Sequence, residues 1–340
     1  VPLQAFVLRI VFCLLSLWLA FASVGARAAG GVELVVPDEL RPLLLKHLGF
    51  LDRHPEGIDA AGRVALLRRA RKEIGEILAT EGYFSPAIEG EDGGDPTFRI
   101  VVTPGVRTTI ASVQLDFSGD LTRDEGDRSA RLAALRDAWA LPVGQPFRQA
   151  DWDAAKQRLI DALSARDYAA ASIADSSAII DPTTASAKLS VEVDSGPAFR
   201  FGPLEISGLV DYDRSLIERY RPPTPGEPYS LERLLRFQTA LQNTTYFASV
   251  VVDIDRQSAT PEAAPVRVQI TEAKPRRVGF GFGVSSNTGY RVETSYRDAH
   301  FFNQAYNLVS GLRIEQRRQL GYADVFLPPS LDGSLDSVGV

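Results

Sequence analysis

The sequence predicts an α+β protein in which three consecutive units of one βααββ type are followed by a run of antiparallel strands. The first observation behind this prediction is a pattern of roughly 80 residues (a strand, two helices and two strands), which recurs three times. The second is a change of character near Pro275, after which no helical periodicity remains and alternating strands rich in glycine and aromatic residues follow.

Composition places the chain among ordinary folded proteins. Of its 340 residues, 24% are charged and 45% are hydrophobic, and the formal net charge is −6. No nucleic-acid partner is expected, because such binding requires a basic surface and this chain is acidic.

The N-terminus has the pattern of a secretory signal peptide, which we expect to cover residues 1–28. An apolar run at 10–22 is followed by Ala26-Arg27-Ala28, the small-residue pattern of a cleavage site. The run is short for a membrane-spanning helix, which needs about 20 apolar residues; an uncleaved anchor is the alternative. The single cysteine, Cys13, lies in this run, so the mature chain would contain no disulfide and no cysteine ligand.

Each unit is predicted to open with a strand and a first, short helix whose apolar residues recur at helical spacing. The expected opening strands cover residues 32–36, 110–117 and 199–206. The expected first helices cover residues 40–48, 128–140 and 213–220. The second and third opening strands end alike, in Ser118-Gly119 and Ser207-Gly208.

The second helix is the clearest element of each unit, because its apolar residues form one face that can pack on a sheet. The predicted faces are Val64, Leu67, Ile74 and Leu78; Trp152, Ala155, Leu159, Ala162 and Leu163; and Leu231, Leu234, Leu235 and Leu241. A Gly-x-Pro-aromatic motif precedes two of these helices, at 144–147 and 226–229. Its proline predicts a turn, and its aromatic residue predicts a contact with the first helical turn.

Two strands are predicted to close each unit. Tyr83, Tyr168 and Tyr246 follow the second helices and mark the start of the first closing strand. The last strands are expected at residues 97–102, 187–193 and 266–270, where most residues alternate between apolar and polar as in half-buried strands.

Beyond Pro275 four amphipathic strands and the start of a fifth are predicted. Residues 279–284 alternate glycine with Phe and Val, and alternating strands follow at 290–297, 307–315 and 319–326. Strands of about ten residues with one apolar and one charged face have the dimensions of membrane-spanning β-strands. A soluble antiparallel sheet shows the same alternation, so the signal peptide and the three preceding units favour the membrane interpretation.

These features together resemble a known family. The three units resemble POTRA domains, and residues 29–340 resemble outer-membrane proteins of the Omp85 superfamily, above all its TamA-like members with three POTRA domains. The motifs that carry the resemblance are 144–147 and 226–229, Gly196-Pro197 with Arg200-Phe201-Gly202-Pro203, Thr245-Tyr246-Phe247 with Val250, and the strand at 278–286. The first unit departs most, because His54-Pro55-Glu56-Gly57 takes the place of the Gly-x-Pro-aromatic motif.

The resemblance implies a domain plan. After the signal peptide at 1–28, the three POTRA domains would cover 29–104, 105–195 and 196–274, and the first strands of an outer-membrane β-barrel would cover 275–340. Four strands and the start of a fifth cannot close a barrel, and an unpaired strand edge is costly in hydrocarbon. We therefore expect this sequence to be part of a longer protein.

The resemblance also implies a non-catalytic function. It predicts an outer-membrane factor, with its POTRA domains in the periplasm, that templates the insertion or secretion of β-rich clients such as autotransporters. The implied partners are a TamB-type inner-membrane protein on the first POTRA domain, unfolded β-barrel clients and the lipid bilayer, with no cofactor. The alternatives are another Omp85 secretion pore, of the two-partner type or with an appended enzyme, and a POTRA adaptor without a barrel.

Two strands are the candidate binding sites. An exposed sheet edge in the third unit could accept an extended client through main-chain hydrogen bonds, and the candidate residues are Phe247, Val250, Val252 and Ile254. The first barrel strand is implied to part from the last strand to admit a client strand, and the candidate residues are Gly279, Phe280, Gly281, Phe282 and Gly283. The glycines would weaken pairing there; alternatively, they make room for side chains inside the lumen.

No catalytic or metal site is expected. His47, His54 and His300 lack the spacing of metal ligands, and His47 is expected to be a partly buried structural residue beside a helix face. The glycines at 279–283 lie between strands, whereas a dinucleotide-binding glycine motif opens a helix. The carboxylate pairs Asp151 with Asp153 and Asp253 with Asp255 are interpreted as a helix start and a solvated strand face.

Overall fold

The computed structural model describes residues 32–49, 59–92, 98–123, 128–286, 289–316, 318–330 and 336–340. The predicted signal peptide at 1–28, with Cys13, and the segment His54-Pro55-Glu56-Gly57 lie outside these residues. Internal contacts divide the chain into two compact units, one of residues 1–111, 143–150 and 179–188, the other of 112–142, 151–178 and 189–340. No helix among the described residues combines the length and the apolarity needed to cross a membrane.

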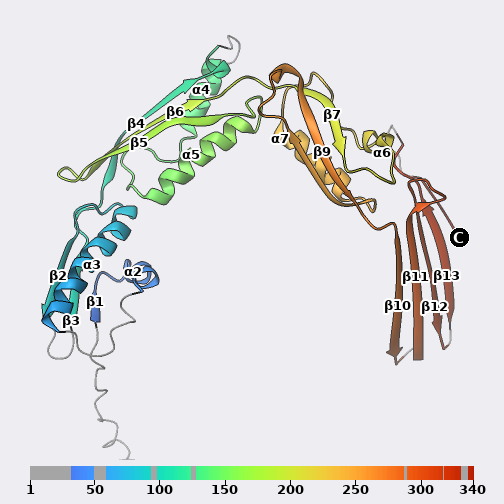
Figure 1. Ribbon diagram of the computed structural model, residues 1–340, viewed down its shortest axis with the longest axis horizontal. Helices are drawn as coiled ribbons and strands as arrows, with labels where there is room; N and C mark the ends of the chain where they lie inside the picture. Colours follow the sequence, from blue (N-terminus) through green and yellow to red (C-terminus); the bar gives the residue numbers. More distant parts are fainter. Residues whose placement is uncertain are drawn as a thin grey trace, which may run out of the picture. The chain divides into compact units, whose positions relative to one another are not determined.

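The first βααββ repeat forms a three-stranded sheet in the order β1-β3-β2 (Figure 1). Strand β1 (Val32–Val35) runs parallel to β3 (Phe98–Thr103), which pairs antiparallel with β2 (Ala87–Asp92). Two helices, α2 (Arg41–His47) and α3 (Ala60–Thr80), complete the repeat, and the Asp59 carboxylate caps α3 by accepting from the Gly62 N–H at 2.8 Å.

The second repeat has the corresponding strand order, β4-β6-β5. Its strands are β4 (Thr109–Ser118), β5 (Ser172–Asp181) and β6 (Ser186–Asp194). Its helices are η2 (Asp120–Thr122), α4 (Arg128–Asp137) and α5 (Gln149–Ser164). The buried face of α5 consists of Trp152, Ala155, Leu159 and Leu163.

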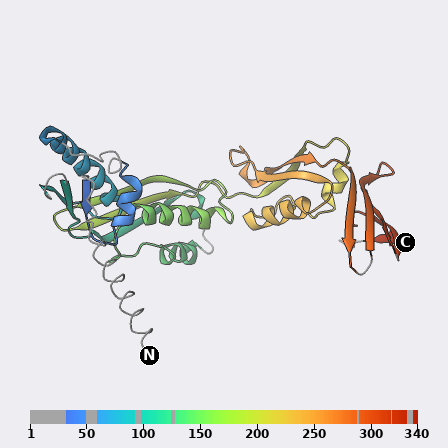
Figure 2. The same ribbon diagram turned by 90° about the horizontal axis from the view of Figure 1, so that it is seen from below.

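The third repeat pairs its strands in the order β7-β9-β8. Strand β7 (Phe201–Ser207) is parallel to β9 (Ala264–Glu272), and β8 (Phe247–Ile254) is antiparallel to it. The helices are α6 (Arg214–Glu218), α7 (Leu231–Gln242) and η3 (Pro261–Ala263). Figure 2 shows α7 lying along one face of this sheet, where its buried residues join a core that includes Phe199 and Phe201.

The predicted helix faces are correct in outline, but five of the predicted residues are not fully buried. Val64, Ala162 and Leu235 are exposed, and Leu67 and Leu231 are only partly buried; the buried positions in α3 and α7 instead include Leu66, Ala70 and Phe237. Each helix buries a narrow stripe at intervals of three or four residues, so an apolar residue one position off this stripe points to solvent.

The Ser-Gly ends of the opening strands reflect close backbone packing. Gly208 has a φ of +87°, and a Cβ at this position would lie 1.9 Å from the Ile270 carbonyl oxygen. Gly119 has a φ of +81°, and a Cβ would lie 2.5 Å from the Ser195 hydroxyl. Only glycine fits these two turns without strain, because a left-handed backbone and a close main-chain neighbour both exclude a side chain.

The Gly-x-Pro-aromatic motif pairs with the edge of the opening strand, in addition to leading into the second helix. Gly144 donates to the Ile110 carbonyl at 2.8 Å, and Phe147 donates to the Thr108 carbonyl at 2.8 Å. In the third repeat Gly226 donates to the Phe201 carbonyl at 2.7 Å in the same way. The motif aromatics, Phe147 and Tyr229, are buried, so the motif closes the first part of this sheet edge and fills the core.

The residues after Pro275 form an antiparallel sheet in the order β10-β11-β12-β13-β14. Its strands are β10 (Arg276–Ser285), β11 (Gly289–Phe301), β12 (Tyr306–Glu315), β13 (Gln319–Phe326) and β14 (Ser337–Gly339). The register places Phe280 opposite Thr294 and Thr294 opposite Leu312, so the apolar residues share one face. On the other face Arg313 and Glu293 form an ion pair at 3.1 Å. The predicted four strands and the start of a fifth are confirmed.

Candidate client-binding edges

Strand β8 lies at the edge of its sheet, but the side chains proposed there as contacts point inward. Phe247, Val250, Val252 and Ile254 are all buried in the core of the third repeat, with at most 8% of each residue exposed. Their side chains therefore stabilise the repeat and cannot meet a partner. Only the main chain of β8 and its outward residues, such as Val251, are accessible.

The main chain of β8 is itself capped by helix α7. The side-chain oxygen Oε1 of Gln238 accepts from the Val252 N–H at 2.9 Å, and the side-chain amide Nε2 of Gln242 donates to the Val250 main-chain carbonyl at 2.9 Å. Because the Val252 N–H is bonded to Gln238, it is not bonded to β9 and points to the outer side of the sheet. Val250 lies two residues earlier in the strand, so its carbonyl points to the same outer side. The two glutamines, spaced four residues apart on one helix face, thus occupy part of the edge.

Strand β10 is the first strand of the open sheet and pairs with β11 on one side. Its apolar side chains, Phe280 and Phe282 among them, are 75% and 82% exposed, on the face predicted to meet lipid. Gly279, Gly281 and Gly283 point to the opposite, polar face.

One glycine of β10 makes room for a side chain of β11. A Cβ at Gly279 would lie 2.6 Å from the Ser295 hydroxyl, whereas a Cβ at Gly283 would lie at an ordinary contact distance, 3.7 Å, from the Arg291 guanidinium. The geometry therefore favours the interpretation that glycine admits side chains on the polar face at Gly279 alone. A glycine-rich strand also packs fewer side chains against its neighbour, so weak pairing of β10 is compatible with the same geometry.

Two buried tyrosines connect the third repeat to this sheet. The Tyr212 hydroxyl donates to the Ala299 carbonyl at 3.2 Å, and the Tyr246 hydroxyl donates to the Ala305 carbonyl at 2.8 Å. Their rings meet edge to face, with centroids 5.2 Å apart. Burial raises the pKa of Tyr246 to about 12 and also raises the pKa of Tyr212, so both hydroxyls remain protonated donors at neutral pH.

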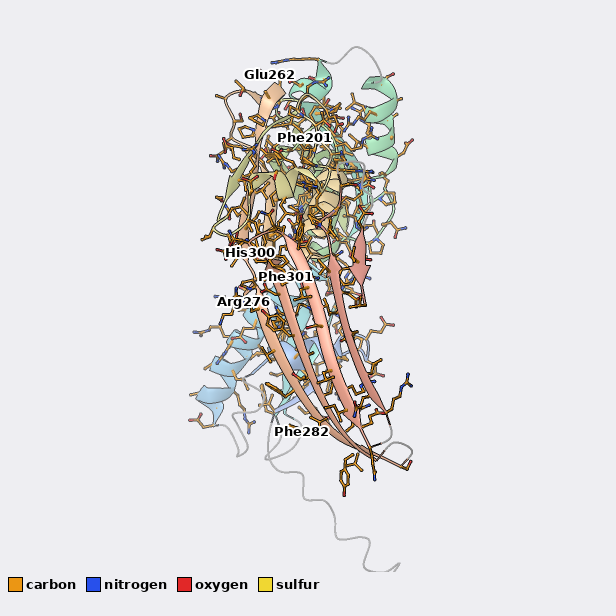
Figure 3. The ribbon with its side chains drawn as sticks, turned by 90° about the vertical axis from the view of Figure 1, so that its right-hand side faces the viewer. Phe201, Glu262, Arg276, Phe282, His300 and Phe301 are labelled. Carbon is orange, nitrogen blue, oxygen red and sulfur yellow. The ribbon has the colours of Figure 1, made fainter. Side chains whose placement is uncertain are left out.

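The base of the sheet is held by a buried carboxylate. Asp298, which is 5% exposed, accepts from the Tyr296 hydroxyl at 3.0 Å, the His300 N–H at 3.0 Å and the Arg276 guanidinium at 3.2 Å. Figure 3 shows Arg276, His300 and Phe301 near one end of the strands and Phe282 near the other. Asp298 therefore joins the start of β10 to the end of β11 beside the third repeat.

The loop that carries Tyr212 is fixed by Glu272 at the end of β9. The Glu272 carboxylate accepts from the N–H groups of Val210, Asp211 and Tyr212, at 2.9, 2.9 and 3.1 Å. Charge-assisted bonds of this kind are stronger than neutral ones and hold a loop firmly. Neither Glu272 nor Tyr212 was identified from the sequence, because their roles depend on contacts between segments about 60 to 90 residues apart.

Titratable groups elsewhere form structural contacts. Among the described residues, no group of three or more His, Cys, Asp and Glu side chains is placed to hold a metal ion. The His300 ring packs on the Tyr212 ring, with the two centroids 5.1 Å apart. His47 is exposed rather than partly buried as predicted, because its position on α2 faces away from the buried side of that helix. Of the carboxylate pairs, Asp153 binds Lys156 at 3.2 Å and Asp253 binds Arg256 at 3.6 Å.

Comparison with known structures supports the predicted architecture at the level of the fold. BamA from Haemophilus ducreyi lacking POTRA domains 1–3 matches with a TM-score of 0.55 and 16% identity, over 66% of this chain and 41% of that chain. POTRA domains 3–5 of BamA from Haemophilus influenzae match with a TM-score of 0.42 and 19% identity, over 60% of this chain and 80% of that one. CdiB from Escherichia coli matches with a TM-score of 0.37 and 16% identity, over 80% of this chain and 48% of that one.

The first of these matches carries the fold assignment. The chain has POTRA-type repeats followed by the first antiparallel strands of a barrel sheet, as predicted. It spans less than half the length of the BamA structure it matches. No family model matches the sequence.

Proposed function

We propose that this chain belongs to an outer-membrane assembly or translocation factor of the Omp85 type, which templates β-rich clients without catalysis. The observation that carries the proposal is the antiparallel sheet that follows the repeats, whose first strand, β10, presents exposed apolar side chains on one face as a membrane strand does. A strand edge in a membrane must be paired, and a client strand can take that place at β10.

The connection between the third repeat and the sheet supports this function. Tyr212 and Tyr246 fix the repeat against the ends of the strands beside it, where Asp298 joins β10 to β11. A client bound on the repeats would then be delivered close to the start of β10, rather than to a freely rotating barrel. Binding energy spent on docking would thereby position the client strand for pairing.

The finer assignments follow from the resemblance to TamA-like proteins. The expected clients are autotransporters and other barrel proteins, and the expected partner of the first repeat is a TamB-type inner-membrane protein. The first repeat offers a groove of about 470 Å³ between α2 and α3, lined by Leu43, His47 and Ile77 among others, where such a partner can bind. The domain boundaries at 29, 105, 196 and 275 belong to the same proposal.

A second candidate function is a secretion pore for one dedicated substrate. The polar face of the sheet, with Arg291, Glu293 and Arg313, favours it, because such a face would line an aqueous lumen. A pore would move its substrate through the lumen and leave the β10 edge unused.

Photo-cross-linking distinguishes the two. A benzoylphenylalanine at Gly281 in β10 is compared with one at Ser295 in β11, which lies on the same polar face one strand inward. During assembly of an autotransporter barrel in outer membranes, we expect client adducts at Gly281 to exceed those at Ser295 at least several-fold. Equal labelling at the two positions supports the pore, and no labelling at either contradicts both functions.

A further inference from the structure

Charged side chains on the polar face of the barrel sheet lie opposite one another on neighbouring strands. Arg291 in β11 lies opposite Glu315 in β12, and Glu293 lies opposite Arg313, with which it forms an ion pair at 3.1 Å. Opposite charges in such cross-strand positions stabilise a sheet, whereas like charges destabilise it. The part of the polar face that lies away from the third repeat is therefore balanced in charge.

One cross-strand pair at the other end of this face breaks the rule. Arg277 in β10 lies directly opposite Arg297 in β11, and both residues are exposed. Because side chains alternate along a strand, the two arginines share the polar face with Gly279 and Ser295. Among the residues that the structure describes, neither guanidinium has a hydrogen bond or an ion pair. Two unpaired cations thus lie side by side, with Cβ atoms about 5 Å apart.

The charged groups around this pair do not neutralise it. In the same row across the sheet the next acidic residue is Asp324, two strands beyond Arg297. With strands about 4.8 Å apart, that separation of about 10 Å is too long for an ion pair. Asp298 lies on the opposite face, where it is paired with Arg276 at 3.2 Å. Lys274, just before β10, adds further positive charge to this end of the sheet.

From this imbalance we propose that Arg277 and Arg297 form an anion-binding pair, which holds a carboxylate of a client polypeptide on the polar face of the sheet. The inference rests on the proposed function and names two residues that select among clients. Both guanidinium groups can donate to one carboxylate, and such charge-assisted bonds are about twice as strong as neutral ones. The bound carboxylate also offsets the repulsion between the two arginines.

A polypeptide fits this position better than a phospholipid headgroup. The two arginines lie on the polar face, whereas Phe280 and Phe282 point to the face predicted to meet lipid. The third repeat is bonded to this end of the sheet, where Figure 3 shows the neighbouring Arg276. A client that leaves the repeats therefore reaches the sheet beside the arginine pair. Clients with an acidic residue in the arriving segment are favoured by charge complementarity.

Two fluorescent decapeptides of alternating serine and valine test the proposal, one with a single central glutamate and the other with glutamine at that position. Their binding to the full-length protein in detergent micelles is measured by fluorescence anisotropy at low ionic strength, where exposed charges are least screened. We expect the glutamate peptide to bind about ten-fold more tightly than the glutamine peptide, or better. In the double variant Arg277→Gln/Arg297→Gln this preference should disappear.

Two further variants control this experiment. Arg291→Gln should keep the preference for glutamate, because Arg291 is also on the polar face of β11 but lies opposite Glu315. The charge-reversed variant Arg277→Glu/Arg297→Glu should instead prefer a lysine peptide. The heat-modifiable band shows which variants are folded, and the double glutamine variant should be at least as stable as the native protein because it loses a like-charge contact. Lower stability with an unchanged peptide preference would overturn the proposal, since the pair would then be structural.

The remaining outcomes separate this inference from the proposed function. Equal binding of the two peptides to the native protein would overturn the anion-binding pair and leave the assembly function standing. Binding of inorganic phosphate to the pair, without a preference for the glutamate peptide, would mean an adventitious ion only and would also overturn it. If the protein neither speeds client folding nor forms client adducts at Gly281, the proposed function itself is wrong.

Discussion

Replacing Phe201 by alanine is expected to lower the free energy of unfolding of the third repeat by about 3–5 kcal/mol, as for other buried aromatic residues. Phe201 is fully buried, its ring lies 5.8 Å from Tyr229, and its main chain anchors the Gly-x-Pro-aromatic segment. Truncation removes core contacts on both sides of that segment and leaves a cavity in the centre of the repeat.

Hydrogen exchange measured by mass spectrometry tests this prediction locally, on peptides from β7 to β9. A loss of this size should raise the exchange of the most protected amides by roughly two to four orders of magnitude. Val251→Ala on β8 is the matched control, because Val251 is 51% exposed and its truncation should change stability by no more than about 0.5 kcal/mol. Equal protection in the Phe201 variant and the control would contradict this description of the core.

The double variant Tyr212→Phe/Tyr246→Phe is expected to loosen the third repeat from the barrel sheet, at a cost of about 2–4 kcal/mol. It keeps both rings but removes the two donors to Ala299 and Ala305, so buried or partly buried carbonyls lose their partners. Faster exchange should be confined to residues near 299–306 and 210–212. In membranes, client insertion should slow while client binding to the repeats persists.

Alkaline pH should have the same effect as this double variant. The folded-state pKa of Tyr246 is raised from its ordinary value near 10 to about 12. The contribution of its hydroxyl to the free energy of unfolding is therefore fully present below pH 10 and is lost as the pH rises towards 12. The Tyr212→Phe/Tyr246→Phe variant has neither hydroxyl, so its stability should not show this additional loss between pH 10 and 12. If the double variant lost as much stability between pH 10 and 12 as the native protein does, the two tyrosines would not be the donors that connect the repeat to the sheet.

Periodicity alone predicted most of the fold. The 3.6-residue pattern located the second helices, the period of two located the closing strands, and the alternation after Pro275 placed β10 to β13 within a few residues. The errors fall where the pattern is ambiguous: Val64 and Leu235 are apolar but lie off the buried stripe, as the sequence alone does not fix which side of a helix meets the sheet.

The candidate site was less accessible from the sequence. The position of β8 at a sheet edge was predicted, yet the apolar residues that marked the strand, such as Val250, are the ones turned into the core. What distinguishes one edge from another is a set of side-chain-to-backbone contacts, such as Gln238 with Val252, between a helix and a strand of the same repeat. Glutamine on a helix surface is ordinarily solvated, so its capping role becomes visible only once the distance is known.

The most direct test of the central claim is the folding of a denatured autotransporter barrel into liposomes, with and without the full-length protein. Appearance of the heat-modifiable, folded band is followed over time. If the chain templates client strands, the folding rate should rise at least ten-fold, and the rise should be largely lost in the Tyr212→Phe/Tyr246→Phe variant. Identical folding rates with and without the protein, across a range of lipid compositions, would contradict an assembly function.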